Sequence, residues 1–138
     1  MKPRITIITL GVDDLDTSLT FYRDGLGLPT QGIIGKEFEY GAVVFFDLQN
    51  GVKLALWPRK SIAHDTHLPA QAPSATEFTL AQNVSSKEEV DLVMEQARQA
   101  GAKSIKTAQV TFYGGVCWLF PRSRYACLGN RLESSALP

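Results

Sequence analysis

The chain's two histidines stand three residues apart, with an aspartate between them. His64, Asp65 and His67 carry imidazole and carboxylate groups, which bind divalent metal ions in proteins. The surrounding segment, PRKSIAHDTHLPAQAPSAT at 58–76, is rich in Pro, Ala and Ser and has no hydrophobic period. This composition predicts an irregular linker without a helix to hold the three side chains on one face. We therefore expect solvated loop residues here rather than a metal site.

Three acidic residues of the first half offer a different chemistry. Glu37 and Glu39 precede a strand-like run, and Asp47 stands near its end. Glu39 is a weak candidate for a general base, because a carboxylate that faces a substrate can accept its proton. No partner acid is evident, so the pattern assigns no catalytic pair. Asp47 precedes Asn50-Gly51 and is more simply interpreted as a turn residue.

Aromatic side chains occur in strand-like runs of both halves. Successive residues of a strand point to opposite faces, so each sheet face receives some of these rings. Rings that line a hollow hold planar or apolar molecules by stacking and burial. Alternatively, the rings fill that hollow or an interface between two chains. The residues concerned are Phe45, Phe46, Trp57, Phe112, Tyr113 and Trp118.

The composition narrows the classes of function. The 138 residues have a formal net charge of zero and a hydrophobic fraction of 44%. No basic excess is present to neutralise phosphates, so we expect no nucleic-acid partner. Apolar runs are only strand-sized, and MKPRITI lacks a signal-peptide core, which predicts a cytoplasmic protein without a membrane partner. Cys117 and Cys127 form neither a disulfide framework nor a CxxC metal pattern.

The elements that position these residues begin with a strand that leads directly into a helix. A β-branched run over 5–12 predicts the strand, and Asp14 or Asp16 can cap the helix. Gly25 or Gly27 can close the helix, since glycine adopts the left-handed conformation at little cost. The apolar face of this helix has the spacing Leu15, Leu19, Tyr22 and Leu26.

The rest of the first half is predicted to be a loop and a hairpin. Residues 29–35 are interpreted as loop, and 37–40 as a short strand of their own. A Val- and Phe-rich run ending at Leu48 predicts a further strand. Asn50-Gly51 is a strong hairpin signal, and residues 52–57 form the expected return strand.

The opening pattern recurs in the second half. Residues 77–84 predict a strand, Ser85 and Glu88 match a capping box, and a helical face follows. The junctions at Val12 and Val84 lie 72 residues apart, which indicates an internal duplication. Residues 103–111, 115–120 and the tail are expected to supply the remaining strands. The predicted helical face consists of Val90, Val93, Ala97 and Gly101, with Gly101 closing the helix.

This paired pattern resembles the vicinal oxygen chelate superfamily, which contains glyoxalase I, bleomycin-resistance proteins and extradiol dioxygenases. The stretches that carry the resemblance are GVDDLDTSLTFYRDGLGL, NGVKLALWPR, VSSKEEVDLVMEQARQAGA and FYGG. The resemblance implies an α+β fold of two βαβββ modules that form a sheet-lined cup, with helices on the convex side. The whole chain, 1–138, would be one such domain, with modules at 1–58 and 77–138 and a linker at 59–76.

The metal ligands of the superfamily come from the first and last strands of each module. In metal-dependent members they are His, Glu or Gln at four equivalent places. The resemblance places these positions at Ile7, Ala55, Thr79 and Gly129. None of these side chains is a credible ligand for a divalent ion, so we predict neither a metal site nor a cofactor.

The tail, residues 116–138, departs from the superfamily pattern. Relatives close with a segment of the form GGYxGYFxDPDGHxWEVxxNP, whereas this chain has VCWLFPRSRYACLGNRLESSALP after Gly114-Gly115. A back-translation of this tail, read one base later, gives VFAGYFQDPDTHAWEIAWNPALY. We infer that the tail is a frameshifted version of the closing strands, either as a true feature of the chain or through a sequencing error. Its last strand would be Tyr125–Glu133, whose glycine and poor alternation predict weak pairing.

We therefore expect a homodimeric small-molecule-binding protein of the bleomycin-resistance type, whose partner is a small hydrophobic or aromatic molecule. A metal-dependent glyoxalase-like lyase or isomerase is the first alternative. An interaction-only domain without a ligand is the second. The expected ligand-binding residues are Thr9, Phe45, Trp57, Thr79, Tyr113 and Trp118.

Overall fold

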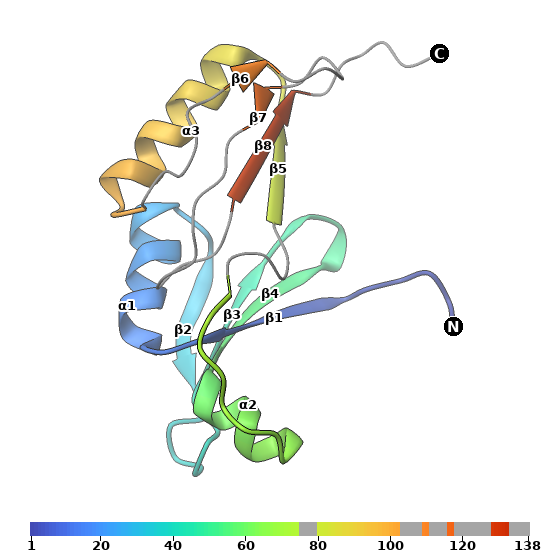
Figure 1. Cartoon of the computed structure of the whole chain (residues 1–138), viewed down its shortest axis with the longest axis vertical. Coiled ribbons are helices and arrows are strands. Elements are labelled where there is room, and N and C mark those ends of the chain that lie inside the picture. Colours follow the sequence, from blue (N-terminus) through green and yellow to red (C-terminus); the bar gives the residue numbers. More distant parts are fainter. Residues whose placement is uncertain (75–79, 103–108, 111–115, 118–127, 133–138) are drawn as a thin grey trace. The chain divides into compact units, whose positions relative to one another are not determined.

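In a computed structural model the chain forms two compact units, Met1–Ala72 and Pro73–Pro138, which we describe separately (Figure 1). The structure describes residues 1–74, 80–102, 109–110, 116–117 and 128–132. These residues contain both helices and strands, and antiparallel strand pairs occur in both units, so the predicted α+β class is confirmed.

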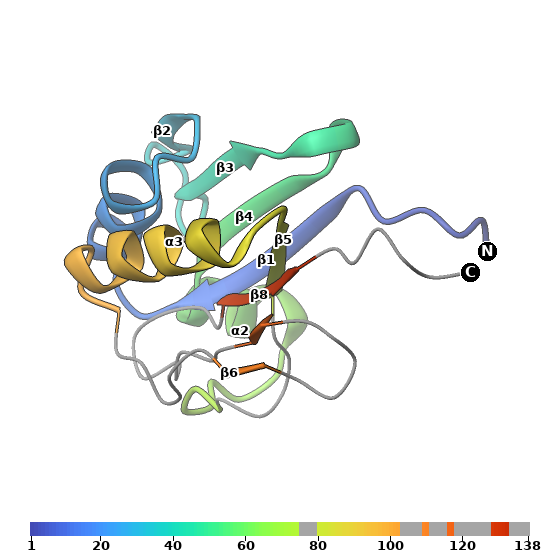
Figure 2. The same ribbon diagram turned by 90° about the horizontal axis from the view of Figure 1, so that it is seen from above.

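Unit 1 contains a four-stranded sheet in the order β1-β4-β3-β2 (Figure 2). β1 pairs in parallel with β4, and the other neighbours are antiparallel. Helix α1 (Leu15–Leu19) and a π-helical continuation, η1 (Thr20–Gly25), connect β1 to β2. The first half is therefore βαβββ, as predicted. The strands are β1 (Ile7–Val12), β2 (Thr30–Ile34), β3 (Val43–Asp47) and β4 (Lys53–Pro58).

One face of this sheet forms the core of the unit. Alternation along the strands directs every second side chain to this face, where α1 and η1 supply the opposing apolar residues. The ring of Tyr22 lies 5.7 Å from that of Phe46, centroid to centroid. The buried side chains are Leu10, Val12, Val44, Phe46, Leu54 and Leu56 from the strands and Leu15, Leu19, Phe21 and Tyr22 from the helical segment.

The first helix begins and ends where the sequence predicts. Of the two possible caps, Asp14 is the one used, and its Oδ1 accepts a hydrogen bond from Thr17 N at 2.6 Å. Hydrogen bonds from Thr17 also lower the pKa of this carboxyl group, which remains ionised as a cap should. After η1, Gly27 has a φ of +74°, the left-handed conformation expected at a helix end.

The hairpin between β3 and β4 is also confirmed. A 3₁₀ turn, η2 (Gln49–Gly51), joins the strands. Asn50 and Gly51 have φ values of +58° and +74°, and Val52 N donates to Gln49 O at 3.3 Å. Both central residues therefore have the positive φ that an Asn-Gly hairpin turn requires.

The prediction for residues 29–40 is wrong. Thr30–Ile34, expected to be a loop, is strand β2, and residues 37–40 form turns rather than a strand. Gly32, with a φ of +89°, lies within an irregularity in the pairing of β2 with β3. The glycine and this irregularity interrupt the alternation that marks a strand in the sequence.

The prediction of an irregular linker is wrong for Arg59–Thr66, which forms helix α2. Tertiary contacts explain the helix, since Arg59 Nε lies 2.9 Å from Asp13 Oδ1 and Arg59 Nη2 donates to Gly11 O at 3.1 Å. Ser61 is buried within unit 1. The helix ends at His67, whose φ of +56° is left-handed. Local composition contains none of these long-range contacts.

Unit 2 repeats the strand-to-helix connection. β5 (Leu80–Val84) leads to α3 (Lys87–Gln99), and β5 pairs in parallel with β8 (Leu128–Leu132) as β1 does with β4. Two short strands, β6 (Gln109–Val110) and β7 (Val116–Cys117), pair antiparallel. The closing strand lies within the predicted range 125–133. The remainder of the predicted second-half strands lies outside the described residues.

Helix α3 has the predicted face but begins one residue later than predicted. Val90 and Ala97 are buried, and Gly101 follows the helix with a φ of +94°. The capping residue is Ser86, whose Oγ accepts from Glu89 N at 3.1 Å, while Glu89 Oε2 accepts from Ser85 N at 2.7 Å. Two adjacent serines and two adjacent glutamates made the register ambiguous in the sequence.

Candidate functional site

The open face of the unit 1 sheet, on the side away from α1, contains three of the predicted ligand-binding residues. The strand register places Thr9 opposite Ala55, and Ala55 opposite Phe45. Trp57, two residues after Ala55 on β4, lies on the same face. The sheet therefore presents Thr9, Phe45 and Trp57 on one surface.

A hollow of about 340 Å³ lies on this face. Ile7 and Ile34 both line it and are 49% and 47% exposed, so the hollow has an apolar surface in contact with water. The ammonium group of Lys53 pairs with the Asp47 carboxylate beside them. The hollow therefore combines an apolar surface with one polar border. It is lined by Ile7, Gln31, Gly32, Ile34, Phe45, Asp47 and Lys53.

Of the three predicted ligand-binding residues that the structure describes, only Phe45 lines this hollow. Thr9 is exposed on the same face, and Trp57 is half-buried, with its Nε1 donating to Tyr40 O at 3.1 Å. Thr79, Tyr113 and Trp118 lie outside the described residues. Gln31, Asp47 and Lys53 were not predicted as site residues, because β2 was missed and Asp47 was interpreted as a turn residue.

The positions equivalent to metal ligands offer no donor atoms where the structure describes them. Ile7 lines the hollow, and Ala55 is 1% exposed. Gly129 lies in β8 opposite Ala81, and Thr79 is outside the described residues. Within the described ranges, no group of three or more His, Cys, Asp or Glu side chains is arranged to hold a metal ion. These residues therefore do not fit the metal that the superfamily uses.

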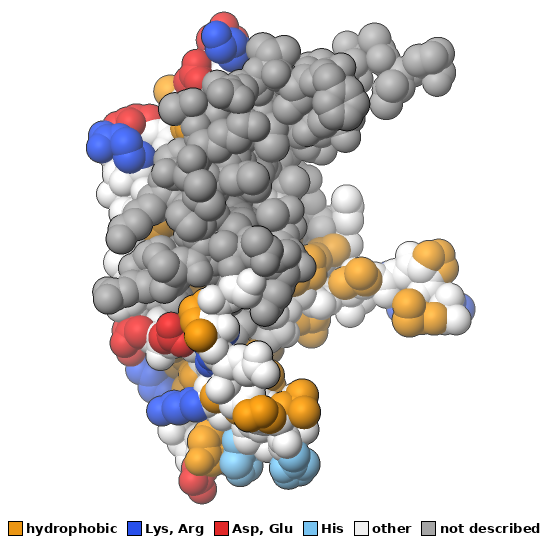
Figure 3. All heavy atoms as spheres, in the orientation of Figure 1, with side chains coloured by type: hydrophobic (Ala, Val, Ile, Leu, Met, Phe, Trp, Pro, Cys, Tyr) orange, Lys and Arg blue, Asp and Glu red, His pale blue; other side chains and the backbone are white. Residues whose placement is uncertain are grey.

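The histidine cluster has a packing role in unit 1. His64 stacks on Tyr40 with ring centroids 4.0 Å apart and ring planes inclined by 13°. His64, Asp65 and His67 are all exposed, and the surface around both histidines carries apolar side chains (Figure 3). The stack connects α2 to the segment between β2 and β3.

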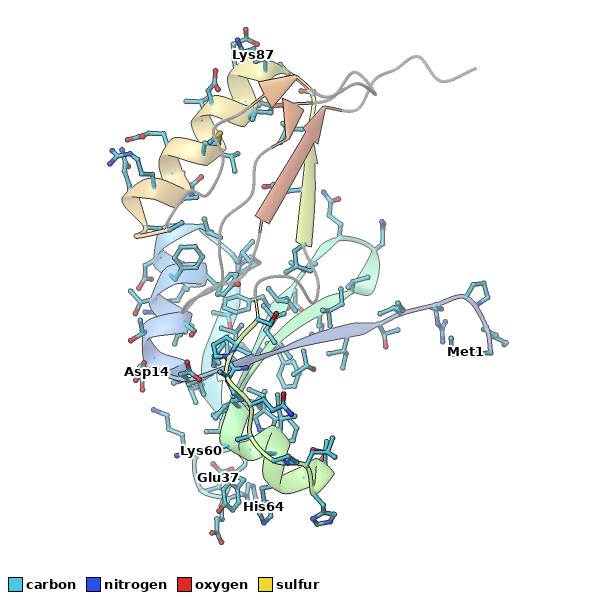
Figure 4. The ribbon with its side chains drawn as sticks, in the orientation of Figure 1. Met1, Asp14, Glu37, Lys60, His64 and Lys87 are labelled. Atoms are coloured by element: carbon cyan, nitrogen blue, oxygen red, sulfur yellow. The ribbon has the colours of Figure 1, made fainter. Side chains whose placement is uncertain are left out.

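A second cavity of about 520 Å³ lies between the start of α1, the β2–β3 segment and the start of α2. Glu39 borders this cavity and not the hollow on the open sheet face. Asp14, Glu37, Lys60 and His64 lie at this end of unit 1 (Figure 4). This cavity could not be predicted from the sequence, because its walls come from segments that are separate in the chain.

Within the described part of the chain, no helix has the length and apolar character needed to cross a membrane.

Several solved structures share the fold. A glyoxalase-related enzyme from Fulvimarina pelagi aligns over 95% of this chain and 88% of its own, with 24% identity and a TM-score of 0.79. A glyoxalase/bleomycin resistance protein/dioxygenase from Nocardioides aligns over 100% and 89%, with 26% identity and a TM-score of 0.69. Lactoylglutathione lyase from Agrobacterium tumefaciens aligns over 96% of both chains, with 19% identity and a TM-score of 0.67.

Among curated proteins, no sequence matches this chain. A family model does match it, over residues 4–117, and the match ends close to where the tail departs from the superfamily pattern. That span contains both strand-to-helix connections and all of the unit 1 sheet. The predicted resemblance is confirmed, and the chain belongs to the Glyoxalase/Bleomycin resistance protein/Dioxygenase superfamily.

Proposed function

We propose that this protein binds a small planar or apolar molecule without the help of a metal ion. The molecule would lie on the open face of the unit 1 sheet and stack on aromatic side chains. The exposed aliphatic surface of the hollow carries this proposal, because water contact with Ile7 and Ile34 is unfavourable and a bound molecule would remove it.

The polar border of the hollow suits a ligand with one polar substituent. Gln31 offers an amide, which both donates and accepts hydrogen bonds. Lys53 and Asp47 neutralise one another, so they can hydrogen-bond a polar group without demanding a particular net charge. An aromatic compound with a hydroxyl, amide or carbonyl group meets both requirements.

The absence of donor atoms at Ile7 and Ala55 supports binding rather than metal-dependent lyase or isomerase chemistry. A divalent ion in proteins needs imidazole, carboxylate, amide oxygen or thiolate ligands. The sec-butyl side chain of Ile7 and the methyl group of Ala55 supply none, so two of the four superfamily positions are chemically unsuitable in unit 1.

The test uses the full chain and the fluorescent probe 8-anilinonaphthalene-1-sulfonate, a planar aromatic compound. We expect saturable binding, and we expect Phe45→Ala to weaken it about two- to tenfold, the effect of removing one aromatic contact. Leu68→Ala is the control, because Leu68 is a 65% exposed apolar residue that lines neither the hollow nor any other cavity described for unit 1. Equal weakening by both variants, or no binding by the native chain, would contradict the proposal.

A thermal unfolding series with added Zn²⁺, Ni²⁺ or Mn²⁺ tests the metal-dependent alternative. A ligand that binds the native state raises the melting temperature. We expect no stoichiometric increase with these ions. An increase that disappears in a histidine-free His64→Ala/His67→Ala variant or in Glu39→Gln would instead favour the lyase or isomerase.

We further propose that the protein is a cytoplasmic homodimer. Exposed apolar side chains outside the hollow, such as Ile5 and Leu68, are suited to a contact between two copies. Sedimentation equilibrium of the purified chain would give twice the 15.2 kDa mass of the monomer, and a single monomeric species would disprove the dimer.

A further inference from the structure

The second cavity of unit 1 has features of a binding site that the proposed function does not use. Its volume of about 520 Å³ is within the range of small-molecule sites and exceeds that of the sheet-face hollow. Its residues come from the β1–α1 junction, the β2–β3 segment and the first turn of α2. It therefore shares no lining residue with the hollow proposed above.

A buried hydroxyl group faces this cavity. Ser61, in the first turn of α2, is 1% exposed and is one of the lining residues. A polar group this deeply buried normally has a partner, and the open side here is the cavity. The hydroxyl can thus accept or donate a hydrogen bond to a molecule inside it.

The aromatic wall of the cavity is held in a fixed position. Phe38 and Tyr40 belong to a closed segment in which Gly41 N donates to Phe38 O at 3.0 Å. Tyr40 stacks on His64, and its carbonyl oxygen accepts from Trp57 Nε1. Contacts to both β4 and α2 therefore hold the backbone that carries these rings. A ligand that binds here would pay little entropy for ordering this backbone.

Carboxylates dominate the charge of the lining. Asp13, Asp14, Asp16 and Glu39 face two ammonium groups, those of Lys36 and Lys60, so the formal charge of the lining is −2. Arg59, which is not a lining residue, pairs with Asp13 at 2.9 Å, which leaves a formal charge of −1. Asp14 already accepts the capping hydrogen bond of α1, so Asp16 and Glu39 are the carboxylates that can meet a ligand. A cation is therefore favoured over an anion in this cavity.

The carboxylates are spread around the cavity rather than gathered at one point. No three of the Asp, Glu, His and Cys side chains in the described residues are arranged to bind a metal ion. Dispersed negative charge beside ring faces suits a larger cation with a diffuse charge, since ring faces attract alkylammonium groups. From the rings, the carboxylates and the Ser61 hydroxyl, we propose that this cavity binds a small organic ammonium ion.

The test compares choline with 3,3-dimethylbutan-1-ol, its uncharged carbon analogue, on the ¹⁵N-labelled full chain at constant ionic strength. Both molecules have a hydroxyl group and the same shape, so only the charge differs. We expect choline to shift the backbone amide signals of Phe38, Glu39 and Ser61 saturably. The neutral analogue should leave these signals in place at the same concentrations.

Two variants of the same segment make the test specific. We expect Glu39→Gln to weaken choline binding about two- to fivefold, the effect of one exposed cationic contact. Glu37→Gln should leave binding unchanged, because Glu37 is exposed and does not line the cavity. Asp16→Asn, at the start of α1, should weaken binding as Glu39→Gln does.

Three outcomes would overturn the proposal. The first is equal binding of the neutral analogue, and the second is an equal effect of the Glu37 and Glu39 variants. The third is that inorganic phosphate, and not choline, shifts the Ser61 signal, which would assign the site to an anion at the start of α2. None of these results depends on whether the sheet-face hollow binds its own ligand.

Discussion

Two glycines of the segment between β2 and β3 lie where the backbone at Gly35 closely approaches the backbone at Gly41. A Cβ atom placed on Gly35 would overlap Gly41 O, and one placed on Gly41 would lie 2.7 Å from Gly35 O. Gly35 also has a φ of +73°. Both the conformation and the space at this position thus require glycine, and the segment that presents Phe38 and Tyr40 depends on it.

We predict that Gly35→Ala lowers the free energy of unfolding by about 2 to 4 kcal/mol. A left-handed φ costs a residue with a Cβ atom roughly 1–2 kcal/mol, and overlap in a packed site adds a similar amount. Gly27→Ala is the matched control, because Gly27 has a φ of +74° and nothing within 4 Å of the added atom. Urea unfolding should show the smaller loss for Gly27→Ala; equal losses would mean that the overlap is relieved without cost.

For individual residues, the sequence predicts the alternation of strand faces better than it predicts contacts with residues that are distant in the chain. Strand alternation, which is a local property, predicted that adjacent rings such as Phe45 and Phe46 lie on opposite faces of the sheet. Ser61 and Lys53 were not predicted as candidate site residues, because the properties that place them there depend on the fold. Burial of a hydroxyl and pairing of a lysine with Asp47 depend on the fold and have no local sequence pattern.

Among the elements, helix α3 shows what a cap contributes. Ser86 accepts a hydrogen bond from Glu89 N, and Glu89 in turn accepts from Ser85. The hydrogen bonds from the Ser85 side chain and backbone lower the pKa of Glu89, so this carboxylate is ionised at neutral pH, at the positive end of the helix dipole.

We predict that Ser86→Ala destabilises the protein by about 1 kcal/mol, because an N–H group of the first turn loses its acceptor. Ser86→Gly should cost only a few tenths of a kcal/mol, since glycine caps helices better than alanine. The measurement is urea unfolding followed by far-ultraviolet circular dichroism. If alanine and glycine cost the same, Ser86 is not the cap.

The elements that the sequence missed have a common cause. β2 contains Gly32 and an irregular register, and α2 follows Pro58 in a segment of loop-like composition. Both are maintained by contacts with other elements, such as Thr30 Oγ1 with Phe45 O at 2.6 Å and Arg59 with Asp13. Elements with a clear hydrophobic period, β1, α1 and α3, were predicted because their own residues specify them.

For the molecule as a whole, the family match ends at residue 117, before the segment that contains β8. β8 pairs with β5 over five residues, with Gly129 opposite Ala81. Glycine in a strand has no side chain to pack and loses more entropy on ordering than other residues. The parallel pair is formed, but we expect its hydrogen bonds to open easily.

Exchange of amide hydrogens in the full chain tests this expectation. We predict that replacing residues 116–138 with VFAGYFQDPDTHAWEIAWNPALY slows exchange in β5 at least about fivefold, which corresponds to ~1 kcal/mol of strand propensity. Amides of β4, which is paired on both sides within unit 1, are the internal control and should not change. Unchanged or faster exchange in β5 would show that the present tail pairs as well as the usual one.

The strand order of unit 1 has a consequence for biosynthesis. β4 pairs with β1 and is the last strand of the unit 1 sheet along the chain, ending at Pro58. All four strands of this sheet are therefore synthesised before the first residue of β5. The lining residues of both cavities likewise precede residue 62. A change of reading frame after the codon for residue 61 would therefore leave the amino-acid sequence of both cavities unchanged.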